Sequence, residues 1–359
     1  MLSLTYQRRA LHFNFPARTS RGALTEHVAY YLALRDSGQP LVVGWGEAAP
    51  LAGLSPEYGP DFEQIVQQFC AQFNAASHAA LSVAEAAALV PASLPALRFA
   101  LETAVLDLAG GGRRQLYQND FSRGHAPIPI NGLVWMGDAA FMRAQIRQKL
   151  AAGYACLKVK IGSLDFDTEL ALLAEIRAEA DPSQLMLRVD ANGAWGGPEA
   201  MRKLDQLARF DIHSIEQPIA VANWPGPVLE FVCRHSPIPV ALDEQLIGLT
   251  DPSRQEELLD TVRPPYLVLK PTLLGGHGAT RRWIALAEAR GIAWWITSAL
   301  ESNIGLNAVA QLTGEYAVGS FAQGLGTGQL YDNNPAAPLT IEAGALHYDP
   351  AGVWQLPSA

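Results

Sequence analysis

The sequence predicts an α/β protein built on a (β/α) barrel with a second, smaller α+β domain. The chain has 359 residues, which exceeds the roughly 250 residues of a bare barrel. From about residue 126, short apolar runs typical of strands alternate with stretches of helical periodicity. Four successive apolar runs end in charged residues spaced 26, 27 and 27 apart, about one strand-plus-helix unit: Asp190, Glu216, Asp243 and Lys270.

The first 125 residues predict the smaller domain. Residues 1–50 contain three β-like runs, with Ser37 and Gly38 marking a turn between the last two, so we expect an antiparallel meander. Residues 61–110 show helical periodicity, and the last helical stretch should begin at Ser93 and end at Gly110. A sheet followed by helices is an α+β arrangement, which we expect to form a capping lid over the barrel.

Residues 126–331 predict the barrel itself. The strands expected to bear the four charged residues are LMLRVDANG, IHSIEQPI, PVALDEQL and YLVLKPT; CLKVKIG precedes them, and AWWITSA and SFAQGL follow. Residues 332–359 lose this alternation and predict short β segments that return to the capping domain.

Composition narrows the class of protein. Hydrophobic residues make up 49% and charged residues 17% of the chain, which is typical of a globular protein with a sizeable core. The net charge of −9, without a Lys/Arg block, gives no electrostatic footprint for nucleic acid or an anionic membrane. Three cysteines without CxxC spacing argue against a disulfide framework or zinc site and favour the cytoplasm. The N-terminus lacks the apolar core of a signal peptide, and no apolar run is long enough to span a membrane.

The three acids predict a metal site. One such acid, taken alone, is more often a helix N-cap or a salt-bridge partner. Asp190, Glu216 and Asp243 share the barrel spacing, however, and none lies in a capping-box pattern. Three carboxylates at one mouth of a barrel would repel one another strongly, so they require a cation. Hard oxygen ligands suit Mg²⁺, with Mn²⁺ as a possible substitute.

Two lysines two residues apart lie in the strand before these acids. Lys158 and Lys160 should project from the same face, and the apolar residues around them predict a buried strand whose lysine face is the barrel interior. The alternative is a lysine pair that guards an edge strand against aggregation. Lysine has an ordinary pKa of about 10.4 and is no base at neutral pH. We expect the neighbouring ammonium group and partial burial to lower the pKa of this pair.

These motifs resemble the enolase superfamily, specifically its muconate-lactonizing-enzyme-like subgroup. The resemblance covers essentially the whole chain and lies in KVK, VDANGAW, IEQP, ALDEQ and LKPTLLGG. Within the subgroup, SALESNIGLNAVAQL and GLGTGQLYDNN are most similar to the o-succinylbenzoate synthases of menaquinone biosynthesis. The expected seventh strand, AWWITSALES, lacks the His that a mandelate-racemase-type dyad would need. The run GLGTG lacks the Asp-x-Asp of the dipeptide epimerases.

The resemblance implies a modified (β/α)₇β barrel and Mg²⁺-dependent dehydration of 2-succinyl-6-hydroxy-2,4-cyclohexadiene-1-carboxylate to o-succinylbenzoate through an enediolate. The three acids would bind the metal. Lys160 would remove the α-proton and then protonate the departing hydroxyl on the same face. Lys158 would tune the pKa of Lys160 and touch the substrate carboxylate. Lys270, on the opposite side, would be a cation near the enediolate.

Further residues are expected to bind the substrate. Asn192 either approaches the metal site or stabilises the DANG turn, and Glu244 should point away from the cavity. The glycine-rich run of residues 324–328 follows a late strand without the context of a nucleotide-binding fold, so we expect its amides and Ser298 to meet a substrate carboxylate. In the 17–22 loop, Thr19 or Arg21 could contact the succinyl tail, and a solvent-exposed turn is the alternative. The expected set is Asn192, Ser298, Glu301, Gly324, Gly326, Thr327 and Arg21.

Three other functions remain open. N-succinylamino acid racemization begins with the same enediolate but requires Lys270 to reprotonate its opposite face. A Schiff-base lysine aldolase also uses a strand-end lysine, but it leaves the three clustered acids unexplained. A non-catalytic binding protein has no need for paired lysines in a buried strand. The expected partner is a small-molecule carboxylate, and the oligomeric state is left open.

Overall fold

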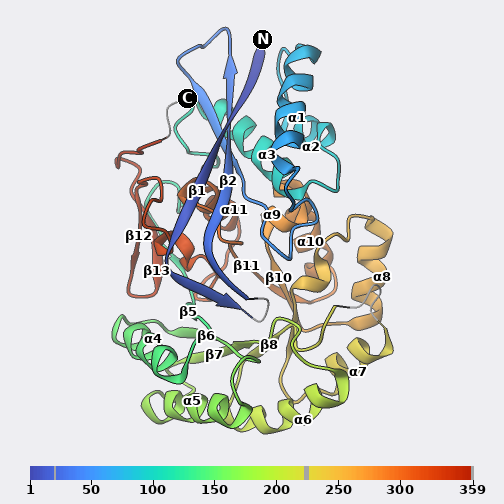
Figure 1. The fold of residues 1–359 in the computed structure, drawn as a ribbon, viewed down its shortest axis with the longest axis vertical. Helices are drawn as coiled ribbons and strands as arrows, with labels where there is room; N and C mark the ends of the chain where they lie inside the picture. The colour runs from blue at the N-terminus through green and yellow to red at the C-terminus, as the bar shows by residue number, and fades with distance from the viewer. Residues whose placement is uncertain (20–21, 222–225, 357–359) are drawn as a thin grey trace.

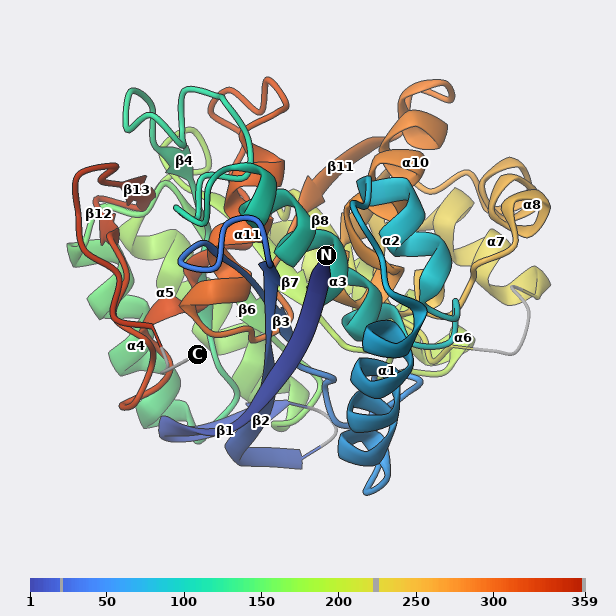
Figure 2. The same cartoon turned by 90° about the horizontal axis from the view of Figure 1, so that it is seen from above.

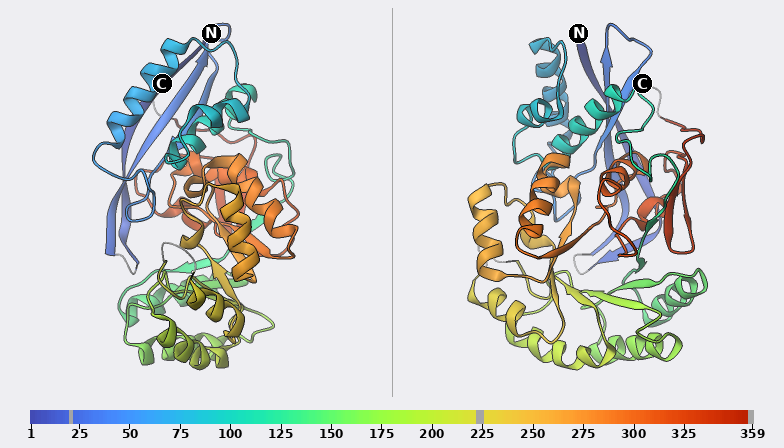
Figure 3. Two further views of the ribbon diagram at one scale, coloured as in Figure 1. Left: turned by 90° about the vertical axis from the view of Figure 1, so that its right-hand side faces the viewer. Right: turned by 180° about the vertical axis from the view of Figure 1, so that it is seen from behind.

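A computed structural model describes residues 1–19, 22–221 and 226–356. Figure 1 shows two parts: long antiparallel strands with helices beside them, and a curled parallel sheet surrounded by helices. The two views of Figure 3 show the same division from the side and from behind. The α/β fold class with an α+β capping part is therefore confirmed. In the described residues, no helix combines the length and apolarity needed to cross a bilayer.

The capping part has the predicted order of sheet followed by helices. Its sheet is antiparallel in the order β1-β2-β3, and the turn at Ser37 and Gly38 joins β2 to β3. The prediction that the last helix begins at Ser93 is wrong, because Pro95 is its first residue and Leu94 its N-cap. The carboxylate of Glu57 instead accepts a hydrogen bond from Ala96 N at 2.6 Å. The elements are β1 (Leu2–Thr19), β2 (Gly22–Asp36), β3 (Val43–Ala48), α1 (Phe62–Ala76), α2 (Val83–Leu89) and α3 (Pro95–Ala109).

Helix α3 packs directly on β3 because β3 has glycines at the contact. A Cβ atom on Gly46 would lie 1.9 Å from the carbonyl oxygen of Ala100, and one on Gly44 would lie 2.1 Å from that of Ala104. The obstacles are helix backbone atoms, which cannot move aside as a flexible side chain could. The close approach of sheet and helix therefore depends on these two glycines.

We expect Gly46→Ala to destabilise the protein by about 3 kcal/mol, at the upper end of the usual cost of overpacking. Urea unfolding followed by circular dichroism measures this change. Gly59→Ala is the matched control, because a Cβ atom there would meet nothing within 4 Å. Equal unfolding midpoints for the two variants would show that β3 and α3 are less tightly apposed than these distances require.

The second part is a parallel sheet whose strands follow one another in chain order, from β5 to β11. Each of these strands is followed by a helix or a pair of helices, as the spacing of charged residues predicts. The strands are β5 (Gly132–Val134), β6 (Cys156–Lys160), β7 (Met186–Asp190), β8 (Ser214–Glu216), β9 (Val240–Leu242), β10 (Tyr266–Leu269) and β11 (Ala293–Ile296). The helices are α4 (Ala139–Ala151), α5 (Phe166–Glu179), α6 (Gly197–Leu207), α7 (Pro227–His235), α8 (Pro252–Val262), α9 (Pro271–Leu274), α10 (Gly276–Glu288) and α11 (Asn303–Thr313).

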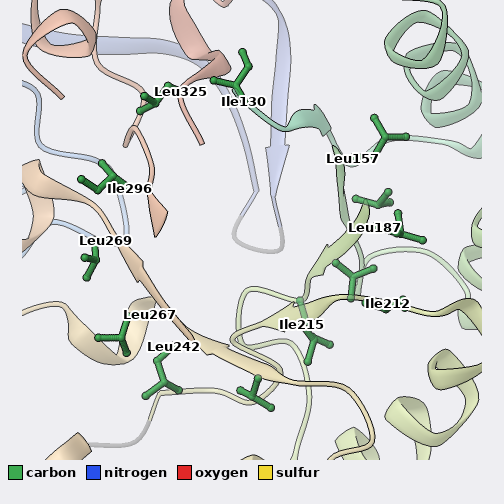
Figure 4. Close-up of a cluster of buried hydrophobic side chains, with 14 of the residues drawn as sticks. Ile130, Leu157, Leu187, Ile212, Ile215, Leu242, Leu267, Leu269, Ile296 and Leu325 are labelled. Carbon is green, nitrogen blue, oxygen red and sulfur yellow. The ribbon is translucent and has the colours of Figure 1, made fainter. Parts of the chain in front are cut away.

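The barrel closes through the segment predicted as its last strand, SFAQGL. This segment forms isolated parallel bridges instead of a full strand: Gln323 pairs with Ile130, and Gly324 pairs with Thr297. Gln323 N donates to Pro129 O, and Gly324 N donates to Ile296 O, each at 2.8 Å. Figure 4 shows the resulting ring, with apolar side chains from successive strands, such as Leu187 and Leu242, arranged around it. The predicted (β/α)₇β barrel is confirmed.

The C-terminal segment forms the expected short β pieces, but they do not join the capping sheet. Strands β12 (Leu339–Glu342) and β13 (Ala345–Tyr348) pair with each other, and β13 pairs with β4 (Ile128–Pro129). Figures 1 and 2 show them on the same side of the molecule as α4. Contact with the cap is made by Asn333, whose amide donates to Ala10 O and accepts from His12 N. The domain boundaries at 125 and 331 stay predictions.

Candidate active site

The predicted acids and lysines come together at one end of the barrel. In the strand register Lys160 lies beside Asp190, and Asp190 lies beside Glu216. Because parallel strands end at the same rim, the next strand, β9, delivers Asp243 there and β10 delivers Lys270. All three carboxylates are buried, with at most 2% of each residue exposed.

Lys158 and Lys160 share one face of β6, as predicted, and both point at the acids. Lys158 Nζ lies 2.5 Å from Glu216 Oε2 and 3.0 Å from Asp190 Oδ2. Lys160 Nζ lies 2.9 Å from Asp190 Oδ2 and donates to Asn192 Oδ1 at 2.7 Å. The edge-strand alternative is therefore wrong, because both lysines are more than nine-tenths buried within a continuous sheet.

Lys270 approaches the acids from the other side of the site. It follows β10, which is separated from β6 by β7, β8 and β9 in the sheet. Its ammonium group is hydrogen-bonded to Asp243 Oδ2 and lies 4.0 Å from Glu216 Oε1. The site thus has ammonium groups on opposite flanks of a carboxylate cluster.

The charges shift the pKa values of these groups strongly. Burial alone would lower the pKa of Lys158, but Asp190, Glu216 and Asp243 outweigh burial and raise it above its ordinary value. The pKa of Lys270 is likewise raised, because the nearby carboxylates outweigh its burial. This direction is opposite to the expected lowering, because the three carboxylates lie close to Lys158 and no cation offsets their charge. The pKa of Asp243 is raised by burial, opposed by Lys270.

The donor set fits a hard divalent cation. Glu216 Oε1 is buried and has no hydrogen-bond partner among the described residues, so this carboxylate has an unused acceptor. Lys158 contacts two of the acids, Asp190 and Glu216. Within the described part of the chain, no group of three His, Cys, Asp or Glu residues has the spacing of a formed metal site. Three buried carboxylates from adjacent strands nevertheless form the oxygen-only set that Mg²⁺ prefers.

Asn192 and Glu244 support this cluster. Asn192 has a left-handed backbone with φ of 46°, and its N–H donates to Asp190 Oδ1 at 3.0 Å, so it stabilises the DANG turn. Its side chain also bonds Lys160, so both expected roles are combined. As predicted, Glu244 does not line the cavity in front of the lysines. Its carboxylate accepts a hydrogen bond from Asn192 Nδ2 at 3.0 Å.

A cavity in front of the lysines contains most of the expected substrate-binding residues. Ser298, Gly324, Gly326, Thr327 and Asn192 line it, together with the three lysines and Asp190. The expectation that the amide of Gly324 meets a substrate carboxylate is wrong, because this N–H donates to Ile296 O at 2.8 Å. A Cβ atom at Gly324 would also lie 2.0 Å from Thr297 Oγ1. The glycine is required by packing inside the barrel wall, whatever binds in the cavity.

Glu301 does not reach the cavity, so its expected contact with substrate is wrong. It is fully buried, and its carboxylate accepts hydrogen bonds from Ser298 Oγ at 2.5 Å and Thr272 Oγ1 at 2.6 Å. Ser298 Oγ also lies 2.6 Å from Thr327 Oγ1. Glu301 therefore orients Ser298. Arg21 lies outside the described residues, and Thr19 is the last residue of β1.

Sequence reasoning missed the apolar walls of the cavity. Leu51 and Leu54 enter from the loop after β3, and Leu133 and Trp135 enter from the end of β5. The position of that loop, directly after a predicted lid strand, was an available signal. The same strand also anchors the cap, because Glu47 accepts hydrogen bonds from Ser302 N, Ser302 Oγ and Gly305 N at the start of α11. Burial raises the pKa of Glu47 to about 7 despite these bonds.

Comparisons with known proteins agree with this geometry. Residues 141–351 match the family model described as enolase C-terminal domain-like. The chain is 45% identical to o-succinylbenzoate synthase of Desulfotalea psychrophila over 369 residues, covering 96% of this chain and 98% of the relative. The crystal structure of MenC from that organism superposes with a TM-score of 0.81 at 42% identity, covering 96% and 99% of the two chains. A dipeptide epimerase from Enterococcus faecalis, complexed with Mg and L-Leu-L-Tyr, shares the fold at 20% identity and a TM-score of 0.81, covering 97% and 96%.

Proposed function

Because this chain belongs to the o-succinylbenzoate synthase family of the enolase superfamily, we propose that it dehydrates 2-succinyl-6-hydroxy-2,4-cyclohexadiene-1-carboxylate to o-succinylbenzoate with Mg²⁺. The observation that supports this reaction best is the placement of Lys158 and Lys160 on one flank of three buried carboxylates, with Lys270 on the other. The product is an intermediate of menaquinone biosynthesis.

In the proposed reaction Lys160 handles both protons. As the free amine it removes the hydrogen α to the substrate carboxylate, and the electron pair of that C–H bond passes into an enediolate. As the ammonium it protonates the departing hydroxyl on the same face, so that the elements of water leave and an aromatic ring forms. Lys160 is suited to this work because it lines the cavity and is oriented by Asp190 and Asn192.

The other charged groups stabilise negative charge. Asp190, Glu216 and Asp243 would hold the divalent cation, which when bound supplies positive charge to the substrate carboxylate as the enediolate develops. Lys158 would contact the same carboxylate, and Lys270 would face the enediolate from the opposite flank. The Mg in the related dipeptide epimerase supports the choice of this metal.

Substitution of Lys270 should distinguish dehydration from racemization. Dehydration requires only a positive charge at this position, so Lys270→Arg should retain more dehydration than Lys270→Ala. Racemization of an N-succinylamino acid requires a proton to move on the second face, and arginine, with a pKa above about 12, cannot act as that base. We therefore expect Lys270→Arg to eliminate racemization while sparing measurable dehydration. Equal loss of both activities in a folded variant would mean that Lys270 transfers a proton during dehydration or that its geometry matters more than its charge.

The direct test of the proposal compares candidate activities of the purified protein. With Mg²⁺ present, loss of the diene absorbance of the cyclohexadiene substrate should be rapid, and it should be measured beside racemization of N-succinylamino acids by optical rotation. A relationship to epimerases makes this second assay necessary, since one from Bacillus subtilis is 30% identical over 171 residues. Borohydride trapping with a keto substrate would detect a Schiff base and so favour an aldolase instead.

We infer that an enzyme with this function is located in the cytoplasm. The three cysteines are all free, and Cys70 and Cys156 are buried. Thiols left unpaired in this way suit a reducing compartment.

A further inference from the structure

Three consecutive residues of the cavity wall, Ser298, Ala299 and Leu300, form a turn between β11 and α11. Leu300 has a backbone φ of 70°, in the left-handed region that a bulky side chain rarely adopts. Such a conformation costs free energy and persists only where the surrounding structure enforces it. The contacts around Leu300 therefore decide the shape of this part of the wall.

Hydrogen bonds hold the backbone on both sides of Leu300. Its N–H donates to Ser298 Oγ at 3.2 Å, and its carbonyl oxygen accepts from the Tyr331 hydroxyl at 2.6 Å. Two residues further on, Ser302 N donates to Glu47 Oε1 at 2.7 Å. Glu47 lies on β3. The capping part therefore supplies one of the contacts that fix this turn.

The carboxylate of Glu47 accepts hydrogen bonds on both of its oxygens. Besides the bond from Ser302 N to Oε1, Oε2 accepts from Ser302 Oγ at 2.6 Å and from Gly305 N at 2.7 Å. Glu47 is fully buried, and the N-terminus of α11 stabilises its charge. Gly305 leaves room for it, since a Cβ atom there would lie 3.0 Å from Glu47 Oε2. An amide in place of the carboxylate would direct its NH₂ group at a backbone N–H in either orientation.

Strand β3 also leads into the apolar wall of the cavity. Glu47 is its fifth residue, and Leu51 and Leu54 in the loop that follows line the cavity together with Leu300. Glu47 itself does not line the cavity. Its contact with the start of α11 therefore ties two segments of the wall together, one from the cap and one from the barrel.

We propose that Glu47 is a positioning residue for the substrate, because its carboxylate holds the Ser298–Leu300 turn in its strained form. The same contact keeps this turn at a fixed distance from Leu51 and Leu54. Glu47 thus acts on substrate affinity through Leu300 and touches neither the substrate nor the metal ion. This inference rests on the proposed function for the choice of ligand in its test.

The test compares Glu47→Gln with the wild type at pH 8, where the wild-type carboxylate is ionised because its pKa is about 7. Isothermal titration calorimetry with Mg²⁺ present should show binding of o-succinylbenzoate weakened about three- to tenfold, the usual range for ordering one side chain. The affinity for Mg²⁺ alone should stay within about twofold, since the substitution is remote from the three acids. Hydrogen exchange of the amides in residues 298–305, followed by mass spectrometry, should become faster.

Glu102→Ala is the matched control for a loosened cap. Glu102 lies on α3 and is also a buried carboxylate that accepts hydrogen bonds from the start of a barrel helix, from His277 N and Gly278 N of α10. None of these three residues lines the cavity. This variant should lower the midpoint of thermal unfolding at least as much as Glu47→Gln, yet leave the affinity for o-succinylbenzoate unchanged.

A double-mutant cycle tests whether Glu47 acts through the turn. In a Leu300→Ala background the apolar contact is already lost, so Glu47→Gln should weaken binding by less than about twofold further. Ser302→Ala removes one of the three hydrogen bonds and should weaken binding in the same direction, which keeps the test open if Glu47→Gln does not fold. Unchanged affinity in folded Glu47→Gln, an equal loss in Glu102→Ala, or full additivity with Leu300→Ala would overturn the inference.

The outcomes also separate this inference from the proposed function. Rapid dehydration by the wild type, together with unchanged ligand affinity in Glu47→Gln, would keep the function and overturn the positioning role. A wild type without dehydration activity would reject the function, and an N-succinylamino acid would then replace o-succinylbenzoate as the ligand. Weaker binding of that ligand in Glu47→Gln but not in Glu102→Ala would keep the positioning role.

Discussion

Lys160→Ala is expected to abolish exchange of the substrate α-hydrogen with solvent and to lower kcat by about 10²–10⁴-fold, the usual contribution of a general base. The reason is geometric: Lys160 lines the cavity, and its ammonium group is held by Asp190 and Asn192. Exchange is measured by mass spectrometry of substrate recovered from D₂O, and kcat by loss of the diene absorbance.

Lys158→Ala is the informative companion, because it removes a lysine from the same strand and the same carboxylate cluster. Lys158 is engaged by both Glu216 and Asp190, so we expect its loss to weaken activity through altered charge while some exchange remains. If Lys158→Ala eliminated exchange and Lys160→Ala preserved it, the proton-transfer roles of the two lysines would be reversed. Thermal unfolding of both variants would check that neither result reflects loss of the fold.

The sequence could predict the barrel and its charged rim because both follow from local repetition. A strand and its helix occupy about 27 residues, so charged residues at that interval must lie at the same rim, and the structure places Asp190 and Glu216 side by side. Alternation along a strand is equally local. It predicts that Lys158 and Lys160 share a face, whatever the rest of the chain does.

The sequence could not predict features that depend on contacts between residues far apart in the chain. The first residue of α3 is set by Pro95 and by a carboxylate from Glu57, nearly forty residues earlier, and the Ser93 prediction had no access to that contact. Strand β13 pairs with β4, which lies far earlier in the chain, and short β segments do not encode their partner. Glu301 looked like a ligand contact because it follows a strand end, yet Thr272 on a neighbouring element satisfies it inside the wall.

The pKa of Lys158 also depends on contacts that the sequence does not show. The neighbouring ammonium group is visible in the sequence, and it alone would lower the pKa of Lys158. The sequence does not show how closely three carboxylates approach that lysine, and their combined charge reverses the direction of the shift. The distances between strands, which the fold sets, therefore decide the direction of this pKa shift.

Glu216→Gln is expected to lower turnover at ordinary Mg²⁺ by about 10³-fold or more, because a metal supplies several kcal/mol of charge stabilisation and each 1.4 kcal/mol is tenfold in rate. Glu216 is the middle acid of the three, and its Oε1 is buried without a hydrogen-bond partner among the described residues, so the isosteric amide removes charge from the centre of the carboxylate cluster. Asp190→Asn and Asp243→Asn should have similar effects.

The decisive measurements pair metal binding with activity. Calorimetry should show Mg²⁺ binding to the wild type and its loss in Glu216→Gln, while thermal unfolding shows that the variant remains folded. EDTA should abolish the activity of the wild type, and added Mg²⁺ or Mn²⁺ should restore this activity, since both are hard cations that bind carboxylate oxygens. Full activity in EDTA-treated protein would defeat the metal assignment. The three lysines would then have to stabilise the enediolate without a divalent cation, although Lys158, Lys160 and Lys270 are already engaged by the same buried acids.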